Sequence, residues 1–185
     1  MTIRRILAFP DPLLRRQARE VERIDGETVR WIDDMVQTMY AAPGVGLAAP
    51  QIGLDERIIV VDVGEEEGAE KPGPQLLRIV NPVIAESEGE IVWEEGCLSV
   101  IDFRAEVRRA GRVLVKGYDP DQREVAIEAE GLLAVALQHE IDHLEGKLFI
   151  DHLSRLKREM YAKRVRKALR EGKPIARGEA KSGGL

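Results

Sequence analysis

The chain has 185 residues, 44% hydrophobic and 33% charged, which suits one globular domain and excludes an intrinsically disordered protein. Its formal net charge of −5 gives no overall reason to expect nucleic-acid binding, and its single cysteine excludes an internal disulfide. No apolar run is long enough to span a bilayer, and Pro10 and Asp11 end the first one too early for a signal peptide. We therefore expect a cytoplasmic protein with no membrane partner.

The N-terminal residues predict two helices. Asp11 followed by Pro12 is typical of a helix start, because aspartate caps the first turn and proline fits the first helical position. A short helix is expected from there through Ala18. Apolar side chains recur at helical spacing over residues 25–41, which predicts a longer, amphipathic helix.

The middle of the chain predicts strands. The segment GVGLAAPQIG (44–53) is too rich in glycine and proline for a helix and should be extended or looped. Residues 57–63 form a β-branched run typical of a buried strand, and residues 64–75 should be a surface loop. Further strands are expected at 76–84, 89–93, 104–108, 112–118 and 123–129. Their close spacing favours antiparallel pairing.

At residues 131–146 the spacing of the apolar residues changes from that of a strand to that of a helix. Gly146 should end this helix. The first half of this helix is apolar nearly all round, so the helix should be buried. The predicted fold is therefore α+β, with antiparallel sheets packed around a central buried helix.

A basic amphipathic helix is expected from Ser154 onward, because residues 155–173 carry nine Lys or Arg and two Glu, a net charge of +7. We found no linker that separates two cores. The expected organisation is a catalytic domain (1–153), a C-terminal basic helix of the same domain (154–171) and a disordered tail (172–185).

The predicted buried helix carries the pattern H-E-x-x-H in QHEIDH. His139 and His143 are four residues apart, so both imidazoles lie on one face and can chelate one metal ion. Glu140 can then reach a metal-bound water without binding the metal, as in zinc hydrolases. The alternative, an ordinary solvated helix face, is disfavoured because two His, Glu140 and Asp142 in a buried helix need a partner.

A catalytic metal site needs three protein ligands and one open position. The third ligand could be Cys97, His152 or a downstream glutamate. We favour Cys97, because a thiolate binds divalent metals strongly and the preceding Glu-Glu-Gly suits a close approach. This donor set by itself suggests zinc.

Three segments in this order resemble the motifs of the peptide deformylase family, and the short loops and long C-terminal helix resemble its bacterial type I enzymes. The three segments are GVGLAAPQIG (44–53), EGCLSV (95–100) and QHEIDH (138–143). The resemblance implies a formyl-L-methionyl peptide amidohydrolase, which removes the N-formyl group from the N-terminal formyl-methionine of newly made proteins. It also implies Cys97, His139 and His143 as ligands, with Fe²⁺ as the working metal and Zn²⁺, Ni²⁺ or Co²⁺ able to occupy the site.

The resemblance further implies roles around the metal. Glu140 transfers the proton, and the Gln51 amide with the Leu98 backbone N–H binds the developing oxyanion. Gly46 lets the substrate backbone come close, and residues 44–48 pair with the nascent peptide as an added strand. The residues expected at the methionine pocket or the substrate are Val45, Trp93, Glu95, Leu132, Val135, Ala136 and Arg104.

The sequence departs from the family pattern at one position, and its basic helix suggests one macromolecular partner. Ile101 stands where the family commonly has proline, which affects the chain path after Val100 rather than the ligand. The basic helix could dock on the ribosome or be only a solvated face; sequence-specific nucleic-acid binding is not expected. Two rival functions are an H-E-x-x-H peptidase that cuts internal amides and a structural Cys/His zinc module that binds RNA.

Overall fold

The computed structural model describes residues 2–42, 44–64 and 76–173. Its elements form an α+β fold, as predicted, with antiparallel strand pairing throughout the two sheets. The helices are α1 (Gly26–Ala41), α2 (Gly131–Leu144) and α3 (Arg155–Arg170). The strands are β1 (Gly46–Ala48), β2 (Ile58–Val61), β3 (Leu77–Glu88), β4 (Ile91–Cys97), β5 (Val100–Arg109), β6 (Arg112–Tyr118) and β7 (Glu124–Glu130).

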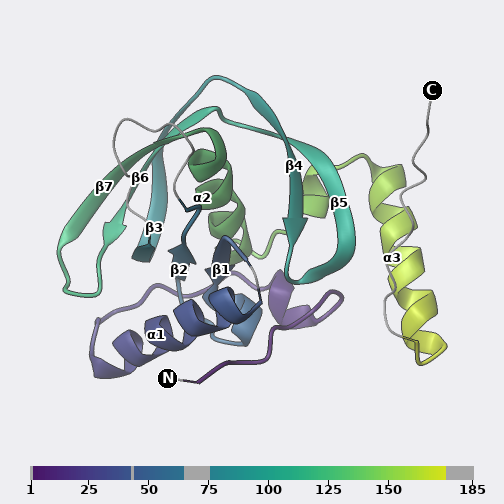
Figure 1. Cartoon of the computed structure of the whole chain (residues 1–185), viewed down its shortest axis with the longest axis horizontal. Coiled ribbons are helices and arrows are strands. Elements are labelled where there is room, and N and C mark those ends of the chain that lie inside the picture. The colour runs from purple at the N-terminus through teal and green to yellow at the C-terminus, as the bar shows by residue number, and fades with distance from the viewer. Residues whose placement is uncertain (1, 43, 65–75, 174–185) are drawn as a thin grey trace.

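The strands divide into a five-stranded sheet, in the order β1-β2-β3-β6-β7, and a two-stranded sheet of β4 and β5. Helix α2 lies between the two sheets, and α1 lies across the end of the molecule near β1 and β2 (Figure 1). The sequence predicted antiparallel pairing correctly but not this division. Helix α2 therefore has strands of both sheets as neighbours.

Helix α2 is buried, as predicted, and carries the H-E-x-x-H pattern on its C-terminal half. Nearly every side chain from Ala134 to Leu144 is inaccessible to solvent, and the apolar ones pack against the five-stranded sheet. Gly146 follows the helix with a φ of 68°, a left-handed conformation that glycine adopts without steric cost. An added Cβ there would lie 2.6 Å from the carbonyl oxygen of Arg15, so this turn also needs the small residue for close packing.

The predicted N-terminal helices are partly confirmed. Asp25 caps α1 by accepting hydrogen bonds from the N–H groups of Glu27 and Thr28. The predicted helix through Ala18 is wrong in length, because only a 3₁₀ turn forms, Pro12–Arg15, capped by Asp11. A second 3₁₀ turn, Ala49–Ile52, lies in the segment expected to be extended or looped.

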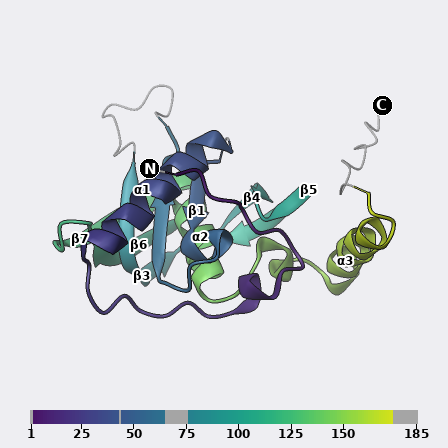
Figure 2. The ribbon, with the colours of Figure 1, turned by 90° about the horizontal axis from the view of Figure 1, so that it is seen from below.

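The N-terminal stretch supports the motif segments. Figure 2 shows it running from the side of α1 toward the side that carries α3. On the way, the Leu7 N–H donates to the carbonyl of Gln51 (2.7 Å) and the Phe9 N–H donates to the carbonyl of Ser99 (2.8 Å). These two hydrogen bonds attach the N-terminal stretch to two of the three motif segments.

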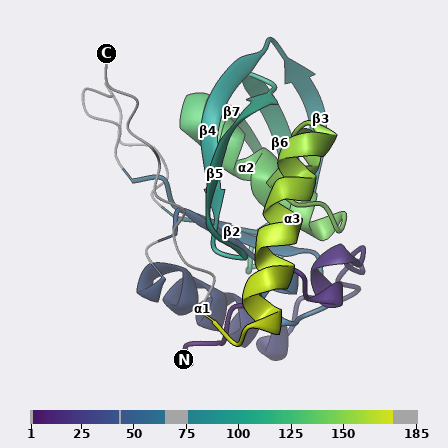
Figure 3. The ribbon, with the colours of Figure 1, turned by 90° about the vertical axis from the view of Figure 1, so that its right-hand side faces the viewer.

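Helix α3 lies outermost, alongside β5 (Figures 1 and 3). Ser154 caps it, and Tyr161 and Val165 bury their side chains in a cluster that includes Leu14 and Val107. The helix therefore shares a core with the rest of the chain. Of the expected tail at 172–185, residues 174–185 lie outside the described part, as do residues 65–75 of the expected loop. No helix among the described residues has the length and apolarity needed to cross a membrane.

Candidate metal centre

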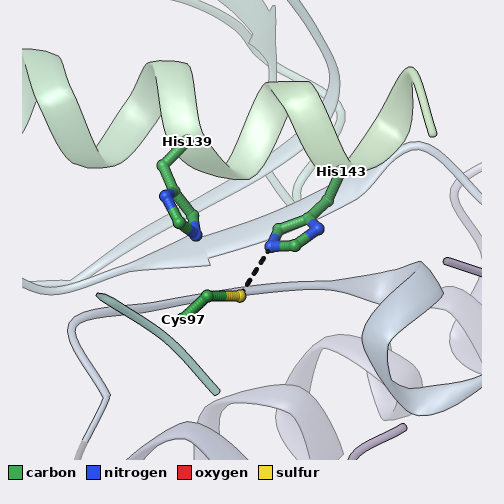
Figure 4. A group of neighbouring side chains, drawn as sticks. All are labelled: Cys97, His139 and His143. Atoms are coloured by element: carbon green, nitrogen blue, oxygen red, sulfur yellow. Dashed lines mark hydrogen bonds between the residues drawn. The ribbon is translucent and has the colours of Figure 1, made fainter. Parts of the chain in front are cut away.

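The two histidines of the H-E-x-x-H pattern project from one face of α2. Cys97, the last residue of β4, faces them, and its Sγ lies 3.3 Å from Nε2 of His143 (Figure 4). One nitrogen of each ring and the sulfur all lie within 4.8 Å of one another. A single ion with bonds of about 2.0–2.3 Å can contact three atoms at this separation. The donors therefore suit one thiophilic divalent metal.

The charge state of the two imidazoles also fits a cation. Burial lowers the pKa of His143 well below its usual value, so this ring stays neutral and has a lone pair to offer. Burial alone would lower the pKa of His139 too, but its contacts with Cys97 and Glu95 raise that pKa well above the usual value. The thiol and the carboxylate thus attract positive charge to His139, where a metal ion would supply it.

A buried chain of charged groups orients His139. Its Nδ1 lies 2.7 Å from Oε2 of Glu95, and both oxygens of Glu95 also accept hydrogen bonds from Arg109 (2.7 and 3.0 Å). Arg109 in turn donates to Asp142 at 2.6 Å. With Nδ1–H donated to Glu95, His139 keeps Nε2 for a metal. Glu95, expected at the methionine pocket, is only 4% exposed and has its oxygens engaged in this chain.

His152 ends this charged chain and does not join the three candidate ligands. Its Nε2 lies 2.6 Å from Oδ2 of Asp142. A surface cavity of about 370 Å³ opens beside His152, Asp142 and Arg109, but its lining includes none of the three candidate ligands. Of the alternatives for the third ligand, the structure therefore brings Cys97 to the histidines and places His152 elsewhere. A closed site with His152 as fourth ligand is not formed.

Replacing Glu95 with Gln should weaken metal binding by about 10- to 100-fold, the usual effect of losing an outer hydrogen-bonding partner of a histidine ligand. The amide keeps the shape of the side chain, but it removes the charge that Arg109 and His139 share. Metal titration of the chelator-treated protein measures the dissociation constant. An unchanged dissociation constant would show that Glu95 does not tune the site.

Glu140 lies beside the candidate ligands and is suited to proton transfer. It is 4% exposed, and burial raises its pKa to about 7 although the neighbouring His139 opposes the rise. Its Oε2 has no hydrogen-bond partner among the described residues. A carboxyl group with a pKa near neutrality can both accept and return a proton at ordinary pH.

Gln51 brings an amide to the same place from the 3₁₀ turn after β1. Its Nε2 lies 3.6 Å from Sγ of Cys97, and the side chain is almost fully buried. Leu98 follows Cys97 directly in the tight connection between β4 and β5. The residues predicted to act on the reacting group thus come from three separate segments that the fold brings together.

A model of polypeptide deformylases matches residues 3–159. The chain belongs to this family. The peptide deformylase of Syntrophobacter fumaroxidans is 50% identical over 171 residues, 92% of this chain and 98% of the relative. That of Rhizobium meliloti is 52% identical over 169 residues, 91% and 95% of the two chains. Among solved structures, the peptide deformylase of Legionella pneumophila is 48% identical and covers 94% of this chain and 100% of its own, with a TM-score of 0.81.

Deformylases remove the N-formyl group from nascent peptides and depend on a metal ion. The chain is therefore a hydrolase of N-terminal processing in protein biosynthesis, as the three motifs predicted. Its possible metal-binding group in the described residues is the set Cys97, His139 and His143.

The expected substrate residues of this deformylase come from α2 and from the strands β1, β4 and β5 or their ends. Val45, just before β1, and Trp93, on β4, have exposed side chains. Arg104 is exposed on β5, with Nη1 3.9 Å from a carboxylate oxygen of Glu94. On α2 itself, Leu132 is half-buried, whereas Val135 and Ala136 are buried.

Sequence reasoning assigned no role to two residues that hold this deformylase site. Arg109 looked like one of many strand arginines; it pairs with Ile91 across the two strands, and only its long side chain reaches Glu95. Ser99 looked like an ordinary part of the CLSV segment. The signal available in the sequence was the position of Ser99, two residues after a candidate ligand.

Gly46 of the deformylase packs directly against Glu140. A Cβ added at Gly46 would collide with Oε1 of Glu140 and lie 2.8 Å from its Cδ. Replacing Gly46 with Ala should therefore displace the carboxylate and lower kcat at least about tenfold, part of the gain that a positioned acid/base group supplies. Metal content should stay unchanged, because no ligand moves. Wild-type kcat in a metal-loaded Gly46→Ala variant would contradict this close contact.

Proposed function

We propose that Cys97, His139 and His143 hold one divalent metal ion and that Glu140 is the acid/base of deformylation. The observation that supports this most directly is the convergence of three ligand atoms within 4.8 Å beside a buried carboxyl group of raised pKa. When bound, the ion would supply Lewis acidity and make a water molecule more acidic. His152 stays outside this assignment because Asp142 engages it.

Separate residues of the chain then carry out the proton transfer and the stabilisation of charge. Glu140 accepts a proton as water attacks the formyl carbon and returns it to the leaving amine. The negative charge that develops on the formyl oxygen is stabilised by the Gln51 amide and the Leu98 backbone N–H. Burial of Glu140 and Gln51 excludes bulk water, which strengthens these interactions.

The substrate backbone enters as an extended strand along residues 44–48. The carbonyl of Gly46 accepts the formamide N–H. The methionine side chain occupies a pocket lined by Val45, Trp93, Leu132, Val135 and Ala136, with Glu95 beside it, and Arg104 contacts the peptide further along. An assay with formyl-methionyl and unformylated peptides tests the reaction. Formate release with an intact peptide chain supports it, and internal cleavage with the formyl group left in place contradicts it.

The metal proposed for this site in the cell is Fe²⁺, with Zn²⁺, Ni²⁺ or Co²⁺ able to replace it. A thiolate ligand on Fe²⁺ is sensitive to oxidation, which fits a reducing cytoplasm as the proposed location. Elemental analysis of protein purified without oxygen tests the assignment. Iron near one atom per chain, with activity lost in air, is the expected result. Zinc in its place, with activity stable in air, would contradict it.

The proposed partner of α3 is the ribosome. Its exposed basic face adjoins exposed Leu156 and Met160, so charge and apolar contact can act together. The double variant Lys163→Glu/Arg166→Glu should weaken co-sedimentation with ribosomes, whereas Lys116→Glu on β6 should not. Equal co-sedimentation of the wild-type protein, the double variant and the Lys116→Glu variant would contradict docking through α3.

A further inference from the structure

Ser99 is fully buried in the motif segment EGCLSV, where it contacts Gln51 of the motif segment GVGLAAPQIG. Its Oγ accepts a hydrogen bond from Nε2 of Gln51 at 3.1 Å. Its backbone carbonyl accepts from the Phe9 N–H at 2.8 Å, and its own N–H donates to Sγ of Cys97 at 3.4 Å. The backbone of Ser99 is thus held on both sides, which makes its hydroxyl oxygen a fixed acceptor.

The amide of Gln51 is held at both ends. Its Oε1 accepts from the Ala48 N–H at 2.8 Å, while its Nε2 donates to Ser99. If the amide were turned over, its NH₂ group would face the Ala48 N–H and its oxygen would face the serine. The first contact would place donor against donor, so the observed orientation is favoured. Ala48 thus fixes the acceptor end and Ser99 the donor end.

The orientation matters because Nε2 has two hydrogens. One is donated to Oγ of Ser99 and the other to Sγ of Cys97 at 3.6 Å, so the second N–H points to the side of the candidate ligands. An oxyanion donor acts only if it is already aimed when the charge develops. We propose that Ser99 is a positioning residue for deformylation, because it holds the Gln51 amide with its N–H toward the reacting group. The inference rests on the proposed role of Gln51 as an oxyanion donor.

The main test is a double-mutant cycle on kcat with metal-loaded protein. Gln51→Ala should lower kcat about 100- to 1,000-fold, as loss of an oxyanion donor does. Ser99→Ala should lower kcat about tenfold with KM unchanged, because one hydrogen bond that orients the donor is lost. The double variant should match Gln51→Ala within about twofold, since Ser99 acts through Gln51.

The outcomes separate two failures. Wild-type kcat in Gln51→Ala would overturn the oxyanion role itself. With Gln51→Ala impaired, wild-type kcat in Ser99→Ala, or an equal loss from Ser99→Ala in both backgrounds, would overturn only the positioning role. Thr38→Val is the matched control, because Thr38 has a buried hydroxyl in α1 bonded to the carbonyl of Asp34. It should lower the unfolding temperature and leave kcat unchanged.

A second readout needs no turnover. In ¹⁵N NMR spectra of the zinc-loaded wild-type protein, the side-chain amide protons of Gln51 should exchange with solvent far more slowly than those of exposed Gln122. In Ser99→Ala, exchange at Gln51 should speed up while metal content and unfolding temperature stay near wild type. Exchange at Gln51 as fast as at Gln122 in the wild-type protein would overturn the proposal even if the variant failed to fold.

Discussion

Replacing Glu140 with Gln should lower kcat for formate release by about two to four decades, the range that a positioned acid/base group supplies. The amide has the size of the carboxyl group, so it keeps the packing against Gly46, but it cannot take a proton from water. No ligand is altered, and the metal should stay at one ion per chain. Steady-state kinetics with a formyl-methionyl peptide and metal analysis of the same sample measure both.

Glu128→Gln is the matched control for this substitution. Glu128 is exposed on β7, so the same change of charge should leave kcat unchanged. Near-wild-type kcat in a metal-loaded Glu140→Gln protein would contradict the assignment. Loss of metal together with activity would also contradict it, because Glu140 would then act as a ligand rather than as the acid/base.

Replacing Cys97 with Ala should remove metal and activity together. In the proposed site the thiolate is one of three protein ligands, and only two imidazoles would remain. The loss of metal affinity should exceed the roughly 10- to 100-fold that an outer hydrogen bond contributes. Metal content after dialysis and kcat per chain are the two measurements.

His152→Ala is the control that separates the two candidates for the third ligand. The structure places His152 on Asp142, so this variant should keep its metal. Metal retained in Cys97→Ala and lost in His152→Ala would reverse the assignment. Metal retained in both variants would mean that a different residue completes the set.

Local signals explain which parts of the fold were predictable. The Asp25 cap and the helical period locate α1, and the alternation before Gly131 locates β7. The spacing of His139 and His143 places two candidate ligands on one helix face without knowledge of the fold. Such features depend on residues a few positions apart, so the sequence contains them directly.

The remaining features depend on long-range contacts. The division into two sheets arises because α2 fills the space between β4 and the five-stranded sheet. The charged chain from Glu95 through Arg109 to Asp142 joins β4, β5 and α2. No local sequence pattern specifies how these three elements are placed against one another. The turn after Asp11 is shorter than predicted because the cap and the proline favour a start but do not set a length.

The metal dependence of formate release tests the central assignment most directly. The protein is stripped with a chelator, and Fe²⁺ is added back without oxygen while formate release from a short formyl-methionyl peptide is followed. Activity should be absent in the stripped protein and rise in proportion to bound metal, up to one ion per chain. Formate release by the metal-free protein at the rate of the metal-loaded one would contradict a catalytic ion at Cys97, His139 and His143.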